Sequence, residues 1–150
     1  MKLAIGSDHA GYELKETVKE YLGEQGVDFK DFGTYSADSC DYPDFGQIVA
    51  EAVASGEYPL GILICGTGIG MSMVANKVPG VRAALCGDTF SAHSSREHNH
   101  ANLLVLGARV VGAGLALDIV KTWLTASPLG DRHARRVEKI AAVERKYGRE

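Results

Sequence analysis

The chain has 150 residues, of which 45% are hydrophobic and 23% charged, with 18 glycines and 4 prolines, a composition typical of one folded domain. A chain of this length buries roughly 70% of the surface that it exposes when unfolded, so its fold requires neither disulfides nor a structural metal. The net charge of -3 argues against a general nucleic-acid binder, and no apolar run approaches the roughly 20 residues of a membrane helix.

In chain order, short apolar runs alternate with segments of helical periodicity. The pattern predicts a strand at 3–6, a helix at 12–24, a strand at 27–32, helix 45–55, strand 61–65, helix 70–77, strand 81–86, helix 90–98, strand 103–107, and helices at 115–124 and 132–147. This alternation is typical of a parallel sheet with crossover helices. The sequence therefore predicts an α/β domain of three layers around a five-stranded parallel sheet.

Two of the helices have informative apolar stripes. In the helix at 45–55, the positions expected to face the core are Ile48, Val49, Ala52 and Val53. The helix at 132–147 carries an apolar stripe among many charges. It could pack on its own domain or on a partner chain.

The cysteines and the first residues indicate a compartment. Cys40, Cys65 and Cys86 are odd in number and lack the spacing of zinc sites and redox motifs, so a reducing environment is expected. The first residues lead directly into a strand-like run, without the basic and longer apolar regions of an export signal. We therefore expect a cytoplasmic protein.

The segment after the predicted strand at 61–65 is a candidate catalytic loop, because ligands of open α/β sheets gather where strands end. Cys65 is followed by Gly66, Gly68 and Gly70 and then by a helix. Backbone N–H groups of such a loop can bind an anion, and the helix N-terminus favours a thiolate. The segment could supply a base or nucleophile with an oxyanion hole, or it could be a tight turn beside a buried cysteine.

Two nucleotide-binding interpretations of this loop are disfavoured. Its spacing is GxGxG instead of GxGxxG, and it follows the third predicted strand instead of the first, so we do not expect a nicotinamide cofactor. No Gly-Lys-Ser/Thr follows, which excludes a P-loop.

Polar residues near other element ends provide further candidates. Asp8 and His9 follow the first strand and could bind a sugar hydroxyl and a phosphate, although Asp8 could equally cap a helix. His98 and Asn99 could act as an acid–base group and a hydrogen-bond donor, with a solvated loop as the alternative. A zinc site at His93, His98 and His100 is disfavoured, because their spacing does not place them on one helix face.

Arg132 and Arg136 lie four residues apart, on one side of the last predicted helix. Their guanidinium groups match a phosphate monoester. A basic first turn opposes the helix dipole, and a bound anion would remove that conflict. The alternative is an ordinary basic first turn.

Seven short segments occur in order along the chain. They are Gly-Ser-Asp-His-Ala-Gly at 6–11, Asp-Tyr-Pro at 41–43, Ile-Cys-Gly-Thr-Gly-Ile-Gly at 64–70, Ala-Asn-Lys at 75–77, Ser-Arg-Glu-His-Asn at 95–99, Gly-Ala-Arg-Val-Val-Gly at 107–112 and Arg-His at 132–133. With them the whole chain resembles the type B ribose-5-phosphate isomerases, a family that also includes galactose-6-phosphate and allose-6-phosphate isomerases.

This resemblance implies a Rossmann-like three-layer α/β sandwich with a five-stranded parallel sheet, formed by one domain over residues 1–150. It implies a homodimer, or a tetramer, with active sites at the interface, and a C-terminal helix at about 132–147 that contributes to the dimer. The expected reaction interconverts ribose 5-phosphate and ribulose 5-phosphate through an enediolate. The alternatives are a hexose 6-phosphate isomerase and a non-catalytic module that binds sugar phosphates.

The resemblance also implies roles for individual residues. Cys65 corresponds to the base, with Thr67 beside it, and His98 and Asp8 correspond to the groups for ring opening and hydroxyl binding. The enediolate is stabilised by the loop and by a nearby amide, namely Gly66, Thr67, Gly68, Ile69, Gly70 and Asn99. The ligand-binding positions, several of them at the phosphate, are His9, Arg109, Arg132 and Arg136.

Two positions distinguish this chain within the family it resembles. Ile69 occupies the loop where some members carry a glutamate base, so the cysteine subgroup fits better. His100 stands where many relatives have aspartate. The resemblance implies no metal, no redox cofactor, and no nucleic-acid or membrane partner.

Overall fold

The computed structural model describes residues 2–148, in which five parallel strands form one sheet of order β2-β1-β3-β5-β4. The strands are β1 (Lys2–Ser7), β2 (Asp28–Asp31), β3 (Leu60–Cys65), β4 (Ala83–Leu85) and β5 (Leu103–Gly107). The helices are α1 (Tyr12–Glu24), α2 (Tyr42–Ala54), α3 (Ile69–Ala75), α4 (Thr89–Glu97), α5 (Ala113–Thr125) and α6 (Arg132–Tyr147). The predicted fold class is confirmed. Positions 1, 149 and 150 of the predicted domain lie outside the described residues.

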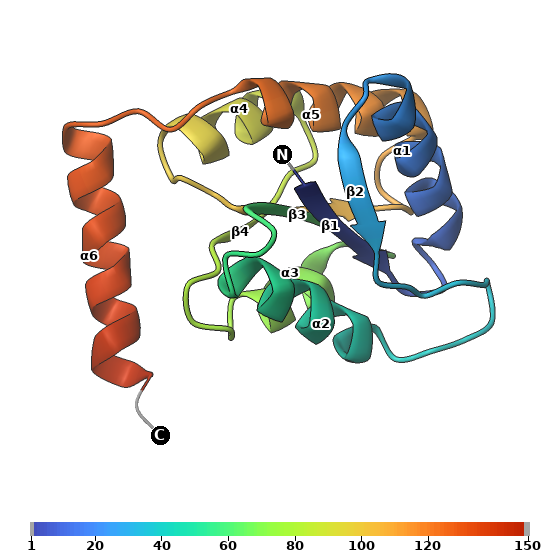
Figure 1. The fold of residues 1–150 in the computed structure, drawn as a ribbon, viewed down its shortest axis with the longest axis horizontal. Helices are drawn as coiled ribbons and strands as arrows, with labels where there is room; N and C mark the ends of the chain where they lie inside the picture. Colours follow the sequence, from blue (N-terminus) through green and yellow to red (C-terminus); the bar gives the residue numbers. More distant parts are fainter. Residues whose placement is uncertain (1, 149–150) are drawn as a thin grey trace.

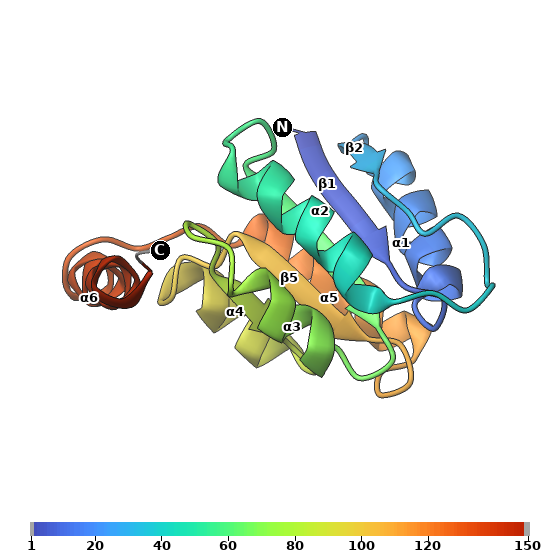
Figure 2. The ribbon, with the colours of Figure 1, turned by 90° about the horizontal axis from the view of Figure 1, so that it is seen from below.

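Helices cover both faces of the sheet (Figures 1 and 2). Helices α1, α4 and α5 lie on one face, and α2 and α3 lie on the other. Alternate residues of a strand face the two layers: on β1, Leu3 and Ile5 pack with the α1 and α5 side, whereas Ala4 packs with the α2 side. Because both faces are covered, β3 is buried along its whole length.

The two edge strands are shorter than the sequence predicts. β2 spans Asp28–Asp31 instead of 27–32, and β4 spans Ala83–Leu85 instead of 81–86. Each has only one neighbour, β2 pairing with β1 and β4 pairing with β5. Single backbone hydrogen bonds continue beyond the strand ends, from the Phe32 N–H to the carbonyl oxygen of Ile5 and from the Cys86 N–H to that of Val105. Of the central strands, β5 matches the prediction at both ends and β3 at one end, whereas β1 extends one residue further than predicted at each end.

Helix α2 begins at Tyr42 and faces the core with a different set of residues from the one predicted. Ile48 is 44% exposed, so its predicted inward position is wrong. A Cβ at Gly46 would lie only 2.9 Å from Met71 Sδ, which shows how closely α3 approaches this position. That approach sets the rotation of α2, and Val49 and Ala50 fill the core.

Lys15 is a buried charge on α1 that the apolar pattern did not predict. Its side chain is fully buried, and Nζ donates hydrogen bonds to Asp31 Oδ1 at 2.7 Å and to the carbonyl oxygen of Thr34. Lys19 Nζ donates to the other carboxylate oxygen of Asp31 at 2.9 Å. These bonds fasten α1 to the end of β2 and to the segment that follows it.

We expect Lys15→Met to lower the free energy of unfolding by about 3 kcal/mol, because it leaves a buried carbonyl without its donor and removes one partner of Asp31. Burial raises the pKa of Asp31, but hydrogen bonds from Lys15, Lys19 and the Gly33 N–H outweigh it and hold the pKa below the ordinary value for an aspartate. A carboxylate with a depressed folded pKa stabilises the fold above its unfolded pKa, and this contribution is lost as the pH falls through the folded value.

The decrease in the free energy of unfolding caused by Lys15→Met should therefore be largest at about pH 7 and smaller below about pH 3. Urea unfolding at the two pH values measures it. Lys19→Met is the matched control, because Lys19 is partly exposed, and it should lower stability by about 1 kcal/mol or less. An equal loss for both variants, or a loss independent of pH, would contradict this account.

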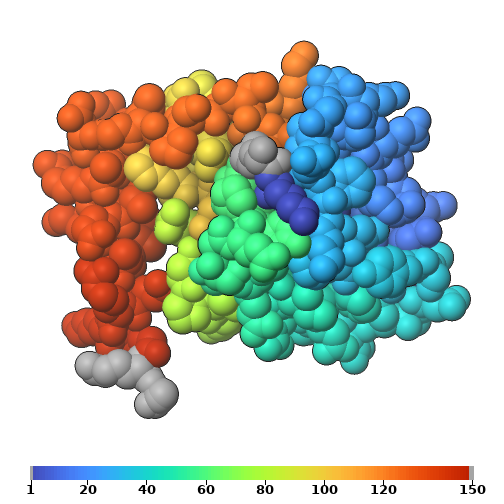
Figure 3. All heavy atoms as spheres, viewed as in Figure 1, coloured from blue at the N-terminus to red at the C-terminus, as the bar shows by residue number. Residues whose placement is uncertain are grey.

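Helix α6 stands apart from the layers, on the side away from the tip of the β1 arrow (Figure 1), and forms a separate column of atoms beside the body (Figure 3). Its side chains Ile140, Val143 and Tyr147 are 50%, 59% and 74% exposed. They line a groove of about 1060 Å³ between α6 and the segment around Val81. The apolar stripe of α6 thus remains largely uncovered within one chain. Within residues 2–148, no helix has both the length and the hydrophobicity to span a bilayer.

Candidate active site

Segments that follow β1, β3 and β5 meet at the carboxyl edge of the sheet. In register, Ser7 lies beside Ile64, and Cys65 lies beside Gly107. The Asp8 N–H donates to the carbonyl oxygen of Ile64 at 3.2 Å, and the Arg109 N–H donates to the carbonyl oxygen of Gly66 at 2.9 Å. These bonds bring the predicted residues Asp8, His9, Cys65 and Arg109 to one edge, where the sequence places them.

Cys65 is the last residue of β3 and is 5% exposed. The chain then turns into α3 through Gly68, whose φ of 82° lies in the left-handed region that favours glycine. Thr67 packs against Gly107 so closely that a Cβ there would lie 2.5 Å from the Thr67 carbonyl oxygen. The turn is therefore tight, and the thiol sits at its base.

The turn carries several backbone donors. Thr67 Oγ1 accepts a hydrogen bond from the Ile69 N–H at 3.2 Å. Within residues 2–148, the N–H groups of Gly66, Gly68 and Gly70 donate to no protein acceptor. Such donors can stabilise a negatively charged oxygen.

The other two cysteines have different surroundings. The pKa of the Cys86 thiol is raised to about 11, mainly by burial and also by the charge of Asp88, although a hydrogen bond with Ser95 lowers it in part. Cys86 therefore stays protonated at neutral pH. Cys40 is half-buried, with Sγ 3.9 Å from His9 Nδ1.

Asp8 and His9 are both held by backbone groups. Asp8 is 6% exposed, and its Oδ1 accepts a hydrogen bond from the Gly11 N–H at 3.0 Å, at the entry to α1. His9 Nδ1 accepts from the Cys40 N–H at 3.2 Å, so the neutral ring carries its proton on Nε2. This contact with Cys40, which is 31 residues away in the chain, was not predicted from the sequence. Its only signal was the neighbouring Asp41-Tyr42-Pro43 segment.

Tyr42 from this segment reaches the glycine turn. A Cβ at Gly70 would lie 2.5 Å from the Tyr42 ring, so the ring packs directly on the backbone there. The segment after β2 therefore borders the site at both His9 and Gly70. Its residues position the turn and the imidazole.

A pocket of about 540 Å³ lies beside this edge and is lined by His9, Arg109 and residues of α1 and of the loop after β5. Arg109 is exposed and lies next to the glycine turn, since a Cβ at Gly66 would be 3.5 Å from Arg109 Nη1. The pocket is also lined by Glu13 of α1, so the guanidinium and the imidazole, and not the pocket as a whole, suit an anionic ligand.

The structure places His98, Asn99, Arg132 and Arg136 elsewhere. Helix α4 runs back from the carboxyl edge, so its C-cap His98 lies near the amino ends of the strands. The carbonyl oxygen of Asn102, shortly after His98, accepts from the Gly61 N–H at 2.9 Å, at the start of β3. Four residues of extended strand, about 13 Å, separate Gly61 from Cys65. A single chain therefore does not bring these four residues to Cys65.

The residues at the amino edge form a cationic cluster of their own. The rings of His98 and His133 stack with centroids 4.3 Å apart and planes 9° apart. Burial lowers the pKa of His133, and the positive charges of His98, Arg132, Arg136 and His100 lower it further. A phosphate group would offset this concentration of positive charge.

The histidines considered for zinc have separate partners. His93 Nε2 lies 2.8 Å from Glu97 Oε2, His98 stacks on His133, and His100 Nε2 lies 2.7 Å from the carbonyl oxygen of Leu129. In the part of the chain that the structure describes, no three His, Cys, Asp or Glu side chains are grouped to hold a metal.

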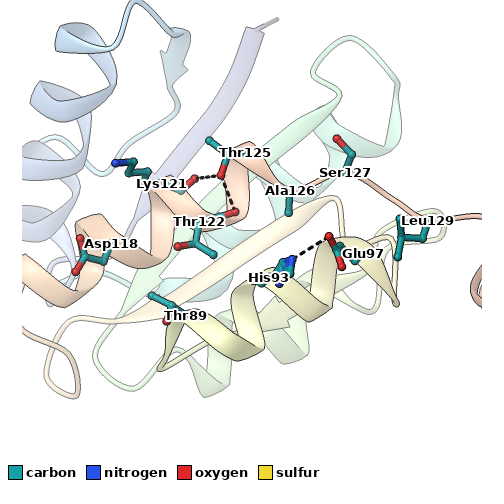
Figure 4. A pocket seen from close by; sticks show the side chains of 10 residues that line it. All are labelled: Thr89, His93, Glu97, Asp118, Lys121, Thr122, Thr125, Ala126, Ser127 and Leu129. Atoms are coloured by element: carbon teal, nitrogen blue, oxygen red, sulfur yellow. Dashed lines mark hydrogen bonds and ion pairs between the residues drawn. The ribbon is translucent and has the colours of Figure 1, made fainter.

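A further pocket of about 630 Å³ lies between α4 and α5 (Figure 4). His93 and Glu97 of α4 lie on one wall, and Thr122 and Thr125 of α5 lie on the other. None of the predicted site residues lines it. We therefore locate the candidate site at the carboxyl edge, where Cys65, His9 and Arg109 lie together, and not in this groove.

The chain was compared with known proteins. Residues 3–140 match the family described as Ribose/Galactose Isomerase. The solved structure of ribose-5-phosphate isomerase B from Clostridium thermocellum is 59% identical, with a TM-score of 0.96 and coverage of 98% of this chain and 99% of that one. Ribose-5-phosphate isomerase B from Escherichia coli K12 is 50% identical over 145 residues, 97% of each chain. D-erythrulose-4-phosphate isomerase from Pectobacterium atrosepticum is 44% identical over 145 residues, 96% of this chain and 95% of the relative.

Proposed function

The chain belongs to the Ribose/Galactose Isomerase family, and we propose that it interconverts ribose 5-phosphate and ribulose 5-phosphate through an enediolate, with Cys65 as the base. The relatives named ribose-5-phosphate isomerase B, at 50% and 59% identity, support this substrate. The mechanism rests mainly on the position of the Cys65 thiol. It lies at the end of β3, directly before the glycine turn, whose N–H groups at Gly66, Gly68 and Gly70 have no acceptor within residues 2–148.

The reaction requires one proton to move between neighbouring carbons. The Cys65 thiolate removes the proton from the carbon beside the carbonyl, and negative charge develops on oxygen. The N–H groups of Gly66, Gly68 and Gly70 receive that oxygen, with Thr67 beside them. The thiol then returns the proton to the adjacent carbon, while the hydroxyl proton moves from the oxygen that becomes the carbonyl to the oxygen that becomes the hydroxyl. One of the two carbons is oxidised while its neighbour is reduced, so the reaction needs no external electron acceptor.

The remaining site residues prepare and hold the substrate. His98 opens the sugar ring by acid–base catalysis, and Asn99 helps to stabilise the enediolate. Asp8 Oδ1 already accepts the Gly11 N–H, so its other carboxylate oxygen binds a sugar hydroxyl. The phosphate end is bound by His9, Arg109, Arg132 and Arg136, which aligns the reacting carbons with Cys65.

We infer that the working unit is a homodimer in which the carboxyl edge of one subunit meets the His98 and α6 cluster of the other. The separation of the two residue groups along β3 supports this arrangement, because neither group is a complete site. The exposed apolar side chains of α6 and the groove beside them supply a surface for a second copy. Free thiols at Cys40, Cys65 and Cys86 support the cytoplasmic location expected from the sequence.

Rates on several sugar phosphates test the substrate. A spectroscopic assay should give a kcat/KM for ribose 5-phosphate at least about tenfold above those for allose 6-phosphate, galactose 6-phosphate and D-erythrulose 4-phosphate. A higher value for another sugar would reassign the substrate. Entry of solvent deuterium into ribulose 5-phosphate would exclude a binding module, whereas a chain that neither exchanges deuterium nor turns over any of these sugars is a binding module and not an isomerase.

A further inference from the structure

His100 lies in the turn between α4 and β5 and is fixed at both its backbone and its side chain. Its φ of 51° is in the left-handed region, which is uncommon for a residue other than glycine. Its carbonyl oxygen accepts a hydrogen bond from Arg82 Nε at 2.9 Å. Its ring points away from the sheet to the segment before α6, where Nε2 lies 2.7 Å from the carbonyl oxygen of Leu129. The ring donates this bond either as an imidazolium or as the neutral form protonated on Nε2.

The Leu129 peptide groups are held on both sides by residues at the end of α4. The Leu129 N–H donates to the carbonyl oxygen of Glu97 at 3.0 Å, and its carbonyl oxygen is the acceptor for His100. Leu129 is itself 44% exposed, so side-chain packing contributes little to its position. Two hydrogen bonds therefore fix the point from which the chain enters α6.

The direction of α6 is set immediately after this point. Asp131, the N-cap of α6, has a φ of 53° and turns the chain sharply. The His133 N–H then donates to the carbonyl oxygen of Gly130 at 3.2 Å. Because only Gly130 and Asp131 separate Leu129 from Arg132, a shift at Leu129 moves the first turn of α6 directly.

The body holds α6 at few other points. The His98 and His133 rings stack near its start, and the Gly80 N–H donates to both carboxylate oxygens of Glu144, at 3.1 and 3.2 Å, near its end. The apolar side of the helix is largely exposed between these points. The position of its first turn therefore depends strongly on the Leu129 anchor.

We propose that His100 is a positioning residue, which holds Leu129 through its ring and thereby places Arg132 and Arg136 for the substrate phosphate. The inference rests on the proposed function in one respect, the role of these two arginines as phosphate ligands. In this proposal His100 acts through Leu129 and not by contact with the sugar.

The test compares His100→Leu with His100→Gln. Neither side chain favours a positive φ, so the backbone penalty is similar, but only glutamine retains an N–H donor near the position of Nε2. In His100→Leu we expect the KM for ribose 5-phosphate to rise about fivefold with kcat changed less than about twofold, because a hydrogen bond that orients the arginines is lost. In His100→Gln both constants should stay within about twofold of the wild type.

Glu144→Ala serves as the matched control, because it releases the far end of α6 and leaves the Leu129 anchor intact. Its KM should stay within about twofold of the wild-type value. An unchanged KM in His100→Leu would overturn the proposal. So would an equal rise in His100→Gln, or a rise in Glu144→Ala that matches the one in His100→Leu.

Hydrogen–deuterium exchange of the unliganded protein gives a readout independent of catalysis. Peptides covering 129–136 should exchange faster in His100→Leu than in His100→Gln or the wild type, because the anchor of the first turn has been lost. Equal exchange in all three proteins would overturn the anchoring step. If the wild-type chain does not isomerise ribose 5-phosphate, the proposed function fails separately, and the exchange comparison still decides whether His100 holds Leu129.

Discussion

Replacing Cys65 with alanine should lower kcat for ribose 5-phosphate by about a thousandfold or more, because the variant has no group at the end of β3 that can remove the substrate proton. The dissociation constant for ribose 5-phosphate should change by less than about threefold, since in the proposed site the arginines and His9 bind the phosphate end and remain unchanged. Cys65→Ser should be nearly as inactive, because a hydroxyl is a far weaker acid than a thiol. Initial rates and calorimetric titration measure the two effects.

Cys86→Ala is the matched control for this experiment. Cys86 is also a buried cysteine at the end of a strand, but its pKa of about 11 keeps it protonated at neutral pH. Its removal should change kcat by less than about twofold, although the cavity that it leaves lowers stability. Substantial activity in a Cys65→Ala protein that is free of wild-type enzyme would eliminate Cys65 as the base.

Mixing two inactive variants should restore activity when their substitutions lie at opposite edges of the sheet. If each site takes Cys65 from one subunit and His98 from the other, a mixed dimer of Cys65→Ala and His98→Ala contains one intact site and one doubly damaged site. After unfolding and refolding together, random pairing should give about a quarter of wild-type activity, because half of the dimers are mixed and each has one working site of two.

The control mixture combines Cys65→Ala with Asp8→Ala. Both residues lie at the carboxyl edge, so each site of a mixed dimer retains one of the two substitutions. This mixture should remain as inactive as its parents. Equal recovery in both mixtures, or none in either, would refute a site shared between subunits. Light scattering on the same samples checks that dimers have formed.

The central part of the fold could be predicted because its signal is local. The apolar runs of β3 and β5 are continuous, as burial on both faces requires, and their predicted ends differ from the observed ends by one residue or none. Lys15 was not predicted to lie in the core, because a pattern of apolar residues cannot indicate an ammonium whose partners, Asp31 and Thr34, come from distant positions. Ile48 was misplaced because the approach of α3 at Gly46, and not the apolar stripe alone, sets the rotation of α2.

The residue types of the candidate site could be selected from the sequence, but their spatial grouping came from the structure. Residues that directly follow a strand lie at the carboxyl edge, as Asp8 and Cys65 do. His98 follows a helix, and a helix that crosses back over the sheet ends at the opposite edge. The order of strands and helices in the sequence therefore already indicated that His98 and Cys65 lie at opposite edges of the sheet. The contact of Cys40 with His9 had no comparable local signal.

In the proposed dimer, each chain contributes two half-sites that its own sheet holds apart. Each newly made copy would then be inert until it meets another, and assembly itself would switch on catalysis. Specific activity should consequently fall on dilution and recover on concentration, and a defective copy would silence one of the two centres in every pair that it joins.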